Sequence, residues 1–502
     1  MEQQAKSIRD TLLKLPDNEI AERKRVFTDY YYYKGKSIDL DKAKQNSALY
    51  GQNWPVDDNV DYKPTQDIRN KVKPLLKKQA RWMFGKKPTL IFKADDLKDK
   101  EKCEELRKFI EDVFENNSFW NNTRKAFLET TIKKRALLRV EANPGQPVVI
   151  KYESIENFFY KEKNGKLLKA IFFEEDEMNV YREEDKDKIY YLHTYYYKVD
   201  ENTKALQAWY RKETYKNTDL VEKNEYDTGF STIPCWLIRN GGELNNTFGE
   251  SDVTDLRDAQ NQYNRRNSDF ADALRFQMFG SESVIDGKEE DVNKLNVAPG
   301  ALHAIRTSDE ALAQGKQATI QKQEYNIGNS EAMNSYLDRA DSDMKETLDM
   351  PKISDLNNIP SAKAMIYLYN DLIARMEEKF NDWEKPLLSL INFIIEVGSV
   401  CYPGLFNKAW LQIKYTKIIK QNYPIPNDID EKKNLAMSEV QADVRSRKSY
   451  LKEFSDEEDA EKAFDEILDE KVQITNAETD QFNKGLDEDL EDIKNNSNSE
   501  GE

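Results

Sequence analysis

Cysteine and histidine are scarce in this sequence. Its 502 residues include three cysteines and two histidines. Cys103, Cys235 and Cys401 are far apart and form no CxxC pair, which argues against a disulfide framework or a zinc knuckle and favours a reducing compartment. His193 lies in an aromatic run and His303 among short apolar residues. Because neither belongs to an HExxH motif, we interpret both as structural and expect no metal and no cofactor.

Motifs for nucleotide hydrolysis, secretion and membrane insertion are also missing. The nearest imitation of a GxxxxGK[ST] loop, Gly280 to Lys288, has the wrong spacing. The N-terminus has no basic flank followed by an apolar stretch, so we expect no signal peptide. The most apolar run, Leu387 to Tyr402, is too short and too polar to span a bilayer. We expect no ATP hydrolysis and no membrane partner.

An excess of basic residues, typical of DNA-binding proteins, is absent as well. The net charge is −17, and residues 453–502 carry 19 acidic residues against 4 lysines. The rest of the chain is therefore close to neutral, at about −2. An acidic end of this kind is usually solvated or binds a partner.

The longest helical pattern follows a polar loop at residues 349–360, in which prolines and asparagines oppose regular structure. Ser361 can cap the helix that follows. Apolar residues then recur every three or four positions from Met365 to Ile394. Pro386 interrupts this pattern, and we predict a kink there rather than an end. Periodicity alone favours an ordinary core helix over a helix around which the chain is organised.

The first 136 residues are predicted to be mainly helical. Their composition predicts a helix over residues 5–30, broken at Pro16, and a basic amphipathic helix over 64–84 that Gly85 ends. A strand at 88–92 and two helices, at 97–117 and 119–136, should follow.

Between residues 137 and 240 the pattern changes to β structure. Aromatic and β-branched runs alternate with turns such as Asn143-Pro144-Gly145 and Asn164-Gly165, which predicts an antiparallel meander. The fold class is therefore α+β, mainly helical.

Residues 250–279 and 323–348 predict two long polar helices. The first has a narrow apolar stripe, which includes Tyr263, Phe270 and Leu274, interrupted by Gln260 and Asn267. Such a helix is too polar for a core, so we expect identical neighbours to pack beside it. Residues 280–320 are irregular, with short strands predicted at 283–285 and 301–305.

The last third should contain a strand at 410–415 and helices at 428–441 and 456–472, with disorder at 495–502.

Five segments are notable for the order in which they occur. They are Tyr31-Tyr32-Tyr33-Lys34-Gly35, Phe84-Gly85-Lys86-Lys87-Pro88, residues 233–240 followed by Gly249-Glu250-Ser251-Asp252, Ser361-Ala362-Lys363-Ala364, and Ser455-Asp456-Glu457. In this series the sequence resembles, over about residues 25–472, the portal proteins of tailed double-stranded DNA bacteriophages, in the branch of siphophages with Gram-positive hosts.

The resemblance implies the regions of a portal subunit. They are a wing (1–249), a stem helix (250–279), a clip (280–322), a second stem helix (323–348), a tunnel loop (349–360), a long kinked spine helix with a wing strand (361–419), a crown (420–475) and an acidic disordered tail (476–502).

It also implies a non-enzymatic ring, typically of twelve copies, at one capsid vertex of the virion, assembled in the host cytoplasm. Double-stranded DNA would pass through the ring, and terminase would dock at the clip. Further implied partners are scaffold protein, major capsid protein and a head-completion or adaptor protein. A head-to-tail interface closes into such a ring when its rotation divides the circle. The candidate DNA-facing residues are Lys352, Asn357, Asn358 and Lys363, although these side chains could equally cap the neighbouring helices.

Two other readings remain open. Scattered carboxylates could build the metal site of a nucleic-acid-processing enzyme, and abundant Asp and Glu make that hard to judge from sequence. Alternatively, the chain could be a scaffold or adaptor without a channel.

Overall fold

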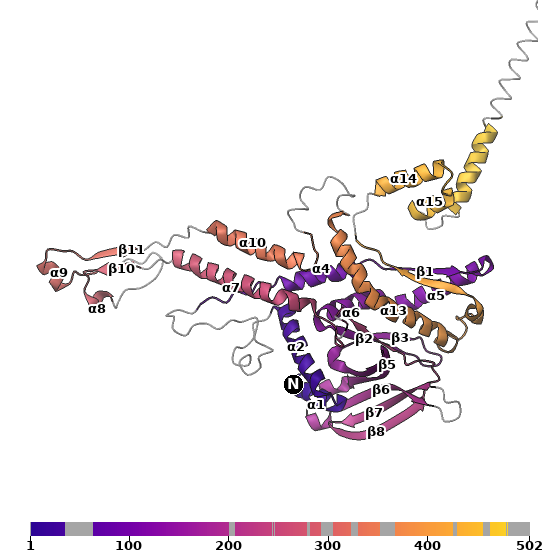
Figure 1. Cartoon of the computed structure of the whole chain (residues 1–502), viewed down its shortest axis with the longest axis horizontal. Coiled ribbons are helices and arrows are strands. Elements are labelled where there is room, and N and C mark those ends of the chain that lie inside the picture. The colour runs from indigo at the N-terminus through magenta and orange to yellow at the C-terminus, as the bar shows by residue number, and fades with distance from the viewer. Residues whose placement is uncertain are drawn as a thin grey trace, which may run out of the picture. The chain divides into compact units, whose positions relative to one another are not determined.

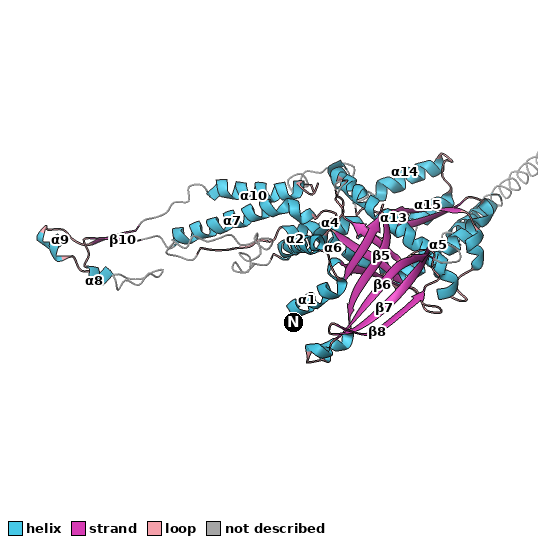
Figure 2. Cartoon of the chain, turned by 60° about the horizontal axis from the view of Figure 1, so that its bottom comes forward, coloured by secondary structure: helices cyan, strands magenta, loops and turns pink. Residues whose placement is uncertain are grey.

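The computed structural model describes residues 2–35, 64–199, 206–242, 244, 246–278, 282–292, 305–322, 330–351, 367–424, 429–454, 462–477 and 479. By its internal contacts the chain divides into a large unit, Met1–Ile359 with Ile366–Pro424, and a small unit, Pro360–Met365 with Ile425–Glu502. Helices predominate in the described residues, as Figure 2 shows. The strands form four small sheets. The predicted α+β class is confirmed.

The N-terminal region forms two helices, α1 (Glu2–Leu13) and α2 (Asp17–Lys34), separated at Pro16 as predicted. The helix α2 ends at Gly35, whose φ of +62° is accessible to glycine at little cost. The Gly35 amide donates to the carbonyl oxygens of Tyr31 and Tyr32, which satisfies the end of the helix.

The helix predicted from residue 64 begins later, at Val72. Residues 64–71 have no helical structure, and α4 covers Val72–Phe84 before Gly85 ends it. The prediction overlooked Pro74, which is tolerated only in the first turn of a helix. Extending the helix backwards would press the proline ring against the Asn70 carbonyl.

The main core forms where α4, α6 (Phe119–Lys133) and α13 (Asn370–Cys401) meet. Trp383 is 1% exposed at its centre, with ring centroids of Phe84 at 5.3 Å, Phe127 at 5.9 Å and Tyr152 at 6.1 Å. The helix α5 (Lys100–Asn116) contributes Phe114, stacked on Phe119.

The helix α13 is continuous through Pro386, so the proline does not end it. The kink there stays a prediction. The regular helix starts at Asn370, after a turn at Tyr369. Tyr367 and Leu368 are also helical, as periodicity predicted, and residues 365–366 lie outside the described residues. Residues 361–366, including the expected cap Ser361, lie outside the described residues.

The β region is two sheets rather than one meander. A five-stranded antiparallel sheet has the order β4 (Phe158–Lys163), β5 (Lys166–Glu175), β6 (Ile189–Val199), β7 (Leu206–Lys216), β8 (Asp219–Asp227). A separate sheet has the order β3 (Val149–Ser154), β2 (Arg135–Glu141), β9 (Cys235–Arg239). The five-stranded sheet confirms the meander, but the helix predicted to residue 136 ends at Lys133 because β2 begins at once.

The last strand of the large unit comes later than predicted. Residues Lys408–Gln412 form a 3-10 helix, since the Asn407 side chain accepts the Ala409 amide at 3.0 Å and caps the turn. The strand is β12 (Tyr415–Lys420), antiparallel to β1 (Thr89–Ala94).

Two long polar helices, α7 (Asp252–Met278) and α10 (Ser330–Glu346), lie side by side in Figures 1 and 2. The chain between them contains β10 (Glu282–Ile285) paired with β11 (Thr319–Lys322), and the short helices α8 (Glu289–Val292) and α9 (Asp309–Ala313). The strand at 283–285 is confirmed. Its partner is β11, and residues 301–304 of the other predicted strand lie outside the described residues.

The small unit contains α14 (Ile429–Gln441), α15 (Arg447–Phe454) and a helix over residues 462–477. Arg445 connects α14 and α15, because its guanidinium pairs with Glu439 and Glu453 and lies 5.7 Å above the Phe454 ring. Residues 455–461 and 480–502, with the predicted disorder at 495–502, lie outside the described residues.

Trp383→Ala should lower the free energy of unfolding by about 3–5 kcal/mol, because it leaves a cavity among aromatic rings that cannot close over it. Leu411→Ala is a matched control, since Leu411 is largely exposed and its loss should cost less than about 1 kcal/mol. Urea unfolding followed by circular dichroism measures both. Equal losses in the two variants would contradict this description of the core.

Candidate functional site at the root of the paired helices

Both long helices are anchored to α13 by one arginine. The Arg375 guanidinium lies 3.1 Å from the carboxylate of Asp349, just after α10, and 3.7 Å from that of Asp252, the first residue of α7. The start of α7 and the end of α10 therefore meet at the same point of α13. The two helices run antiparallel from this root.

Asp252 is the buried centre of the root. Its carboxylate accepts hydrogen bonds from Gln79 of α4 at 2.8 Å, Asn240 at 3.0 Å and Lys379 of α13 at 2.9 Å. Burial alone would raise the pKa of Asp252, but the charges of Lys379 and Arg375 outweigh it and hold the pKa below its usual value. The carboxylate is therefore ionised, and it joins α4, α7 and α13.

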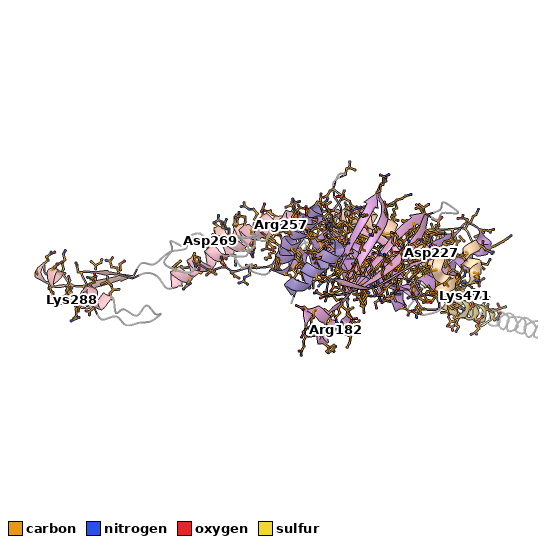
Figure 3. All side chains as sticks on the ribbon, turned by 90° about the horizontal axis from the view of Figure 1, so that it is seen from below. Arg182, Asp227, Arg257, Asp269, Lys288 and Lys471 are labelled. Carbon is orange, nitrogen blue, oxygen red and sulfur yellow. The ribbon has the colours of Figure 1, made fainter. Side chains whose placement is uncertain are left out.

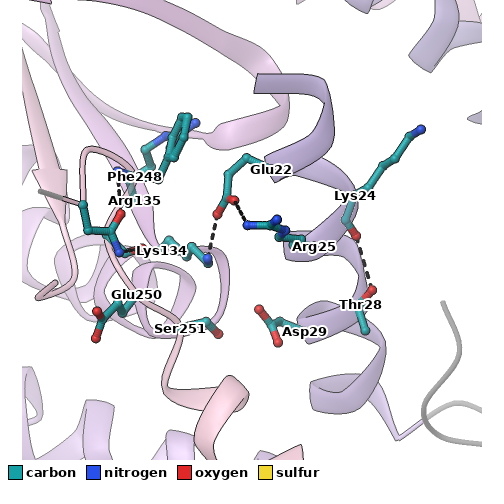
Figure 4. A network of polar contacts seen from close by, with 12 residues as sticks. Glu22, Lys24, Arg25, Thr28, Asp29, Lys134, Arg135, Phe248, Glu250 and Ser251 are labelled. Carbon is teal, nitrogen blue, oxygen red and sulfur yellow. Dashed lines mark hydrogen bonds and ion pairs between the residues drawn. The ribbon is translucent and has the colours of Figure 1, made fainter. Parts of the chain in front are cut away.

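A second group of buried charges connects α2 to the same region. Asp29 accepts two hydrogen bonds from Arg257 of α7, and Glu22 pairs with Lys134 at 2.6 Å. Figure 4 shows Lys134 directed at Glu22, and Asp29 about two turns further along α2, close to Ser251. Burial raises the pKa of Asp29 to about 6, although Arg257 acts in the opposite direction.

A third buried pair fixes the start of β2. The guanidinium of Arg135 is fully buried and its Nη2 lies 2.6 Å from both carboxylate oxygens of Glu19. The same guanidinium lies 4.8 Å above the Phe248 ring, so the loop before α7 covers it.

One face of α7 is polar and buried, and it binds the extended segment 64–71. Side chains four residues apart on α7 accept hydrogen bonds from backbone amides two residues apart in that segment. We call these contacts the polar ladder. In its rungs the side-chain oxygen of the α7 residue accepts the backbone amide of the segment residue: Asp272 from Thr65 at 2.9 Å, Ser268 from Asp67 at 2.9 Å, Asn264 from Arg69 at 3.0 Å and Gln260 from Lys71 at 2.9 Å.

The polar ladder corrects one sequence interpretation. Gln260 and Asn267, taken as signs of lateral packing between copies, bind residues of their own chain, since Gln260 contacts Lys71 and Asn267 contacts Asp67. Buried amides need partners, and the backbone of an extended segment supplies them. The polarity of this face is therefore not evidence for neighbouring copies.

The predicted interface residues lie beside the ladder on α7. Tyr263 is half-buried, with the Lys71 ammonium 5.0 Å from its ring centroid. Phe270 is half-buried, and Leu274 is 41% exposed. Figure 3 shows Arg257 and Asp269 on the same helix, and Lys288 in the module that follows it in the chain. The role of these three apolar residues at an interface stays a prediction.

Of the other predicted site residues, the structure describes Pro386 but not the candidate DNA-facing residues. Pro386 is half-buried within α13. Lys352, Asn357, Asn358 and Lys363 lie outside the described residues, as does His303. His193 lies in β6 with its Nδ1 2.6 Å from the Tyr210 hydroxyl, and the three cysteines are buried and free.

Sequence reasoning did not single out the residues of the root. Arg375 and Lys379 are one turn apart on α13, a spacing that places two cations on the same face. That pair was the available signal. Its partner Asp252 is distant in sequence, and nothing local marks it as buried.

Neither a metal cluster nor a membrane span is found in the described part of the chain. No group of three or more His, Cys, Asp or Glu side chains is placed there to hold a metal ion. Among the helices described, none is long and apolar enough to cross a bilayer.

A family model described as "Phage portal protein, SPP1 Gp6-like" matches residues 12–477. The chain belongs to this family of phage portal proteins.

Two solved structures were also found to be similar. One is the neck of an empty gene transfer agent (GTA) particle computed with C6 symmetry, at 9% identity and a TM-score of 0.40. The other is the virion of a native gene transfer agent particle, at 11% identity and a TM-score of 0.38. Each match covers 78% of this chain and 95% of the other. No protein with a curated description matches the sequence.

Asn264→Ala should expose one rung of the polar ladder, because the Arg69 amide loses its acceptor. We expect hydrogen exchange at Arg69 to speed up by about tenfold or more, which corresponds to about 1.4 kcal/mol of lost protection. Arg265→Ala, the neighbouring exposed position, is the control and should leave this amide protected. An unchanged rate at Arg69 in the Asn264 variant would show that the rung is not formed in solution.

Asp29 should make the folded state less stable as the pH rises. Its folded pKa of about 6 lies above the usual value of 3.8, so the folded state binds more protons in that window. The stability contributed at low pH is therefore lost between about pH 4 and 6, by on the order of 2–3 kcal/mol. Unfolding by urea across this range should show a shallower decline for Asp29→Asn than for the parent chain. The exposed Asp371→Asn should keep the parent slope.

Proposed function

We propose that this chain assembles into a dodecameric ring at one vertex of a phage capsid and forms the channel for DNA packaging and ejection. The observation that carries the proposal is the match of the portal-family model to residues 12–477, and the antiparallel pair α7 and α10 supplies a candidate stem for the ring. Long polar helices of this kind can pack laterally and leave charged faces toward a central hole.

The regions follow from this assignment, with the boundaries expected from sequence. The wing is 1–249, the stem helices are 250–279 and 323–348, the clip is 280–322, the tunnel loop is 349–360, the spine with its wing strand is 361–419, the crown is 420–475, and the tail is 476–502. In this assignment α13 is the spine helix, and the β10–β11 module belongs to the clip.

The tunnel loop is proposed to contact DNA through Lys352, Asn357, Asn358 and Lys363. Its first residue, Asp349, is held by Arg375, which also approaches the buried Asp252. A movement of the loop would therefore act directly on the charges that fix both stem helices. This contact supports a passive or gating role, in which the loop responds to DNA while another protein supplies the energy.

The surface charge of the proposed stem favours sliding over tight binding. The exposed side chains of α7 carry both signs in similar numbers; they include Asp255, Asp258, Asp269, Arg265, Arg266 and Arg275. Strong binding to DNA requires many lysines or arginines against phosphates. Because these charges nearly cancel, a duplex passing such a surface would not be held at one position.

The proposed partners are those of a capsid vertex. Double-stranded DNA passes the channel, a terminase large subunit docks at the clip, and scaffold and major capsid protein surround the ring. A head-completion or adaptor protein follows after packaging. The protein would be located in the virion after assembly in the host cytoplasm, and no catalytic role is proposed.

Leu274→Glu should prevent ring assembly without unfolding the chain. Leu274 is 41% exposed on α7, and a carboxylate there would be buried against a neighbour in every interface of the ring. Negative-stain electron microscopy and mass in solution should show rings of about twelve subunits for the parent chain and dispersed subunits for the variant. Circular dichroism should be unchanged. Leu97→Glu, at a leucine that is 88% exposed in the N-terminal region, should leave the rings intact.

Two results would contradict the proposal. A parent chain that stays monomeric or dimeric at high concentration would show that it does not form a ring. Magnesium-dependent DNA cleavage would favour the alternative of a nucleic-acid-processing enzyme. Rings formed equally well by the Leu274 variant would show that the interface lies elsewhere on the subunit.

A further inference from the structure

A cavity of about 680 Å³ lies within the large unit, away from the root of the paired helices. Its walls come from strands β5 to β8, from β2 and β3, and from the last turns of α13. The assignment to the portal family gives this cavity no role, and none of the residues discussed for the ring or the channel lines it.

Tyrosine rings form one wall of the cavity. The ring centroids of Tyr195 and Tyr210 are 4.9 Å apart, and those of Tyr210 and Tyr226 are 5.2 Å apart. Tyr195 is 7% exposed, and it lines the cavity.

The cationic side chains in the wall are already paired. Arg139 contacts Glu153 at 2.7 Å and Glu141 at 2.5 Å, and Lys151 contacts Glu141 at 3.1 Å. Glu174 is shared between His193 at 3.3 Å and Arg139 at 3.8 Å. These charges are satisfied without a ligand, so they do not mark a site for an anion.

Two carboxylates in the wall have no cationic partner among the described residues. Glu396 of α13 accepts the amide and the hydroxyl of Ser231, each at 2.8 Å, and Asp227 at the end of β8 accepts the Gly229 amide at 2.9 Å. These neutral donors hold the carboxylates in place without balancing their charge. Figure 3 shows Asp227 on the five-stranded sheet.

We propose that this cavity binds an organic cation, an ammonium or guanidinium group on an aliphatic stem. The aromatic wall offers ring faces that attract a cation, and Asp227 with Glu396 supplies the opposite charge. The Tyr195 hydroxyl can accept a hydrogen bond from the same group. The apolar stem would lie against Val397, Val400 and Phe230, which also line the cavity. An inorganic cation would gain less, because it cannot use this apolar surface.

Isothermal titration of the full chain with spermidine, and separately with N-acetylarginine amide, tests the proposal. We expect saturable binding of at least one probe, weakened about tenfold or more in the double variant Asp227→Asn with Glu396→Gln. Glu183→Gln, an exposed carboxylate of the same sheet region, is the control and should bind as the parent does. The proposal is overturned if neither probe binds, if the double variant binds unchanged, or if inorganic phosphate binds in their place.

A matched pair at Tyr226 tests the aromatic wall. Tyr226→Phe keeps the ring and should keep the affinity, whereas Tyr226→Leu keeps only apolar bulk and should weaken binding about fivefold. Equal affinities in the two variants would show that the aromatic ring of Tyr226 does not contribute to binding.

Protein concentration distinguishes the source of the cation. A free amine binds with the same affinity at low and high protein concentration. A lysine or arginine on a second copy of the chain would fill the cavity as the concentration rises, and the affinity for the probe would fall.

Discussion

A carboxylate removed from water can stay ionised only if cations and hydrogen-bond donors surround it, and Asp252 is such a group. Its partners come from α4, from Asn240 directly after β9 and from α13, so the position of several elements depends on satisfying one charge. Removing any partner would leave a buried charge unpaired, which is far more costly than losing a surface contact. The root is therefore rigid for an electrostatic reason, while the aromatic core around Trp383 supplies the packing.

The elements that periodicity defines were predictable from sequence. The break at Pro16, the end of α4 at Gly85, the five-stranded meander and both long polar helices follow from local residue patterns. Errors occurred where one residue or a distant contact overrides the pattern. Pro74 shortens α4, and the Asn407 side chain converts a predicted strand into a 3-10 turn. Alternation of apolar residues cannot reveal either effect, because the first is a clash of a proline ring with the backbone and the second is a hydrogen bond from the backbone to a side chain.

The candidate site was much less accessible to sequence reasoning. The root joins residues separated by more than a hundred positions, such as Asp252 with Arg375 and Lys379. Carboxylates are so common in this chain that none is conspicuous. The polar residues of α7 were wrongly interpreted as a sign of neighbouring copies for a related reason. A buried amide and an exposed amide look the same in sequence, and only the structure shows that residues 64–71 cover this face of α7.

The rungs of the polar ladder advance by different distances along α7 and along residues 64–71. Four helical residues advance about 6.0 Å, whereas two residues of an extended chain advance about 6.6 Å, so the mismatch reaches roughly 2 Å after three steps. The rungs can coincide only over a short length, which limits the ladder to few rungs. A shift by one residue would turn every amide away from the helix. The register of α7 on residues 64–71 can therefore change only in discrete jumps of about 6 Å, and intermediate positions are excluded.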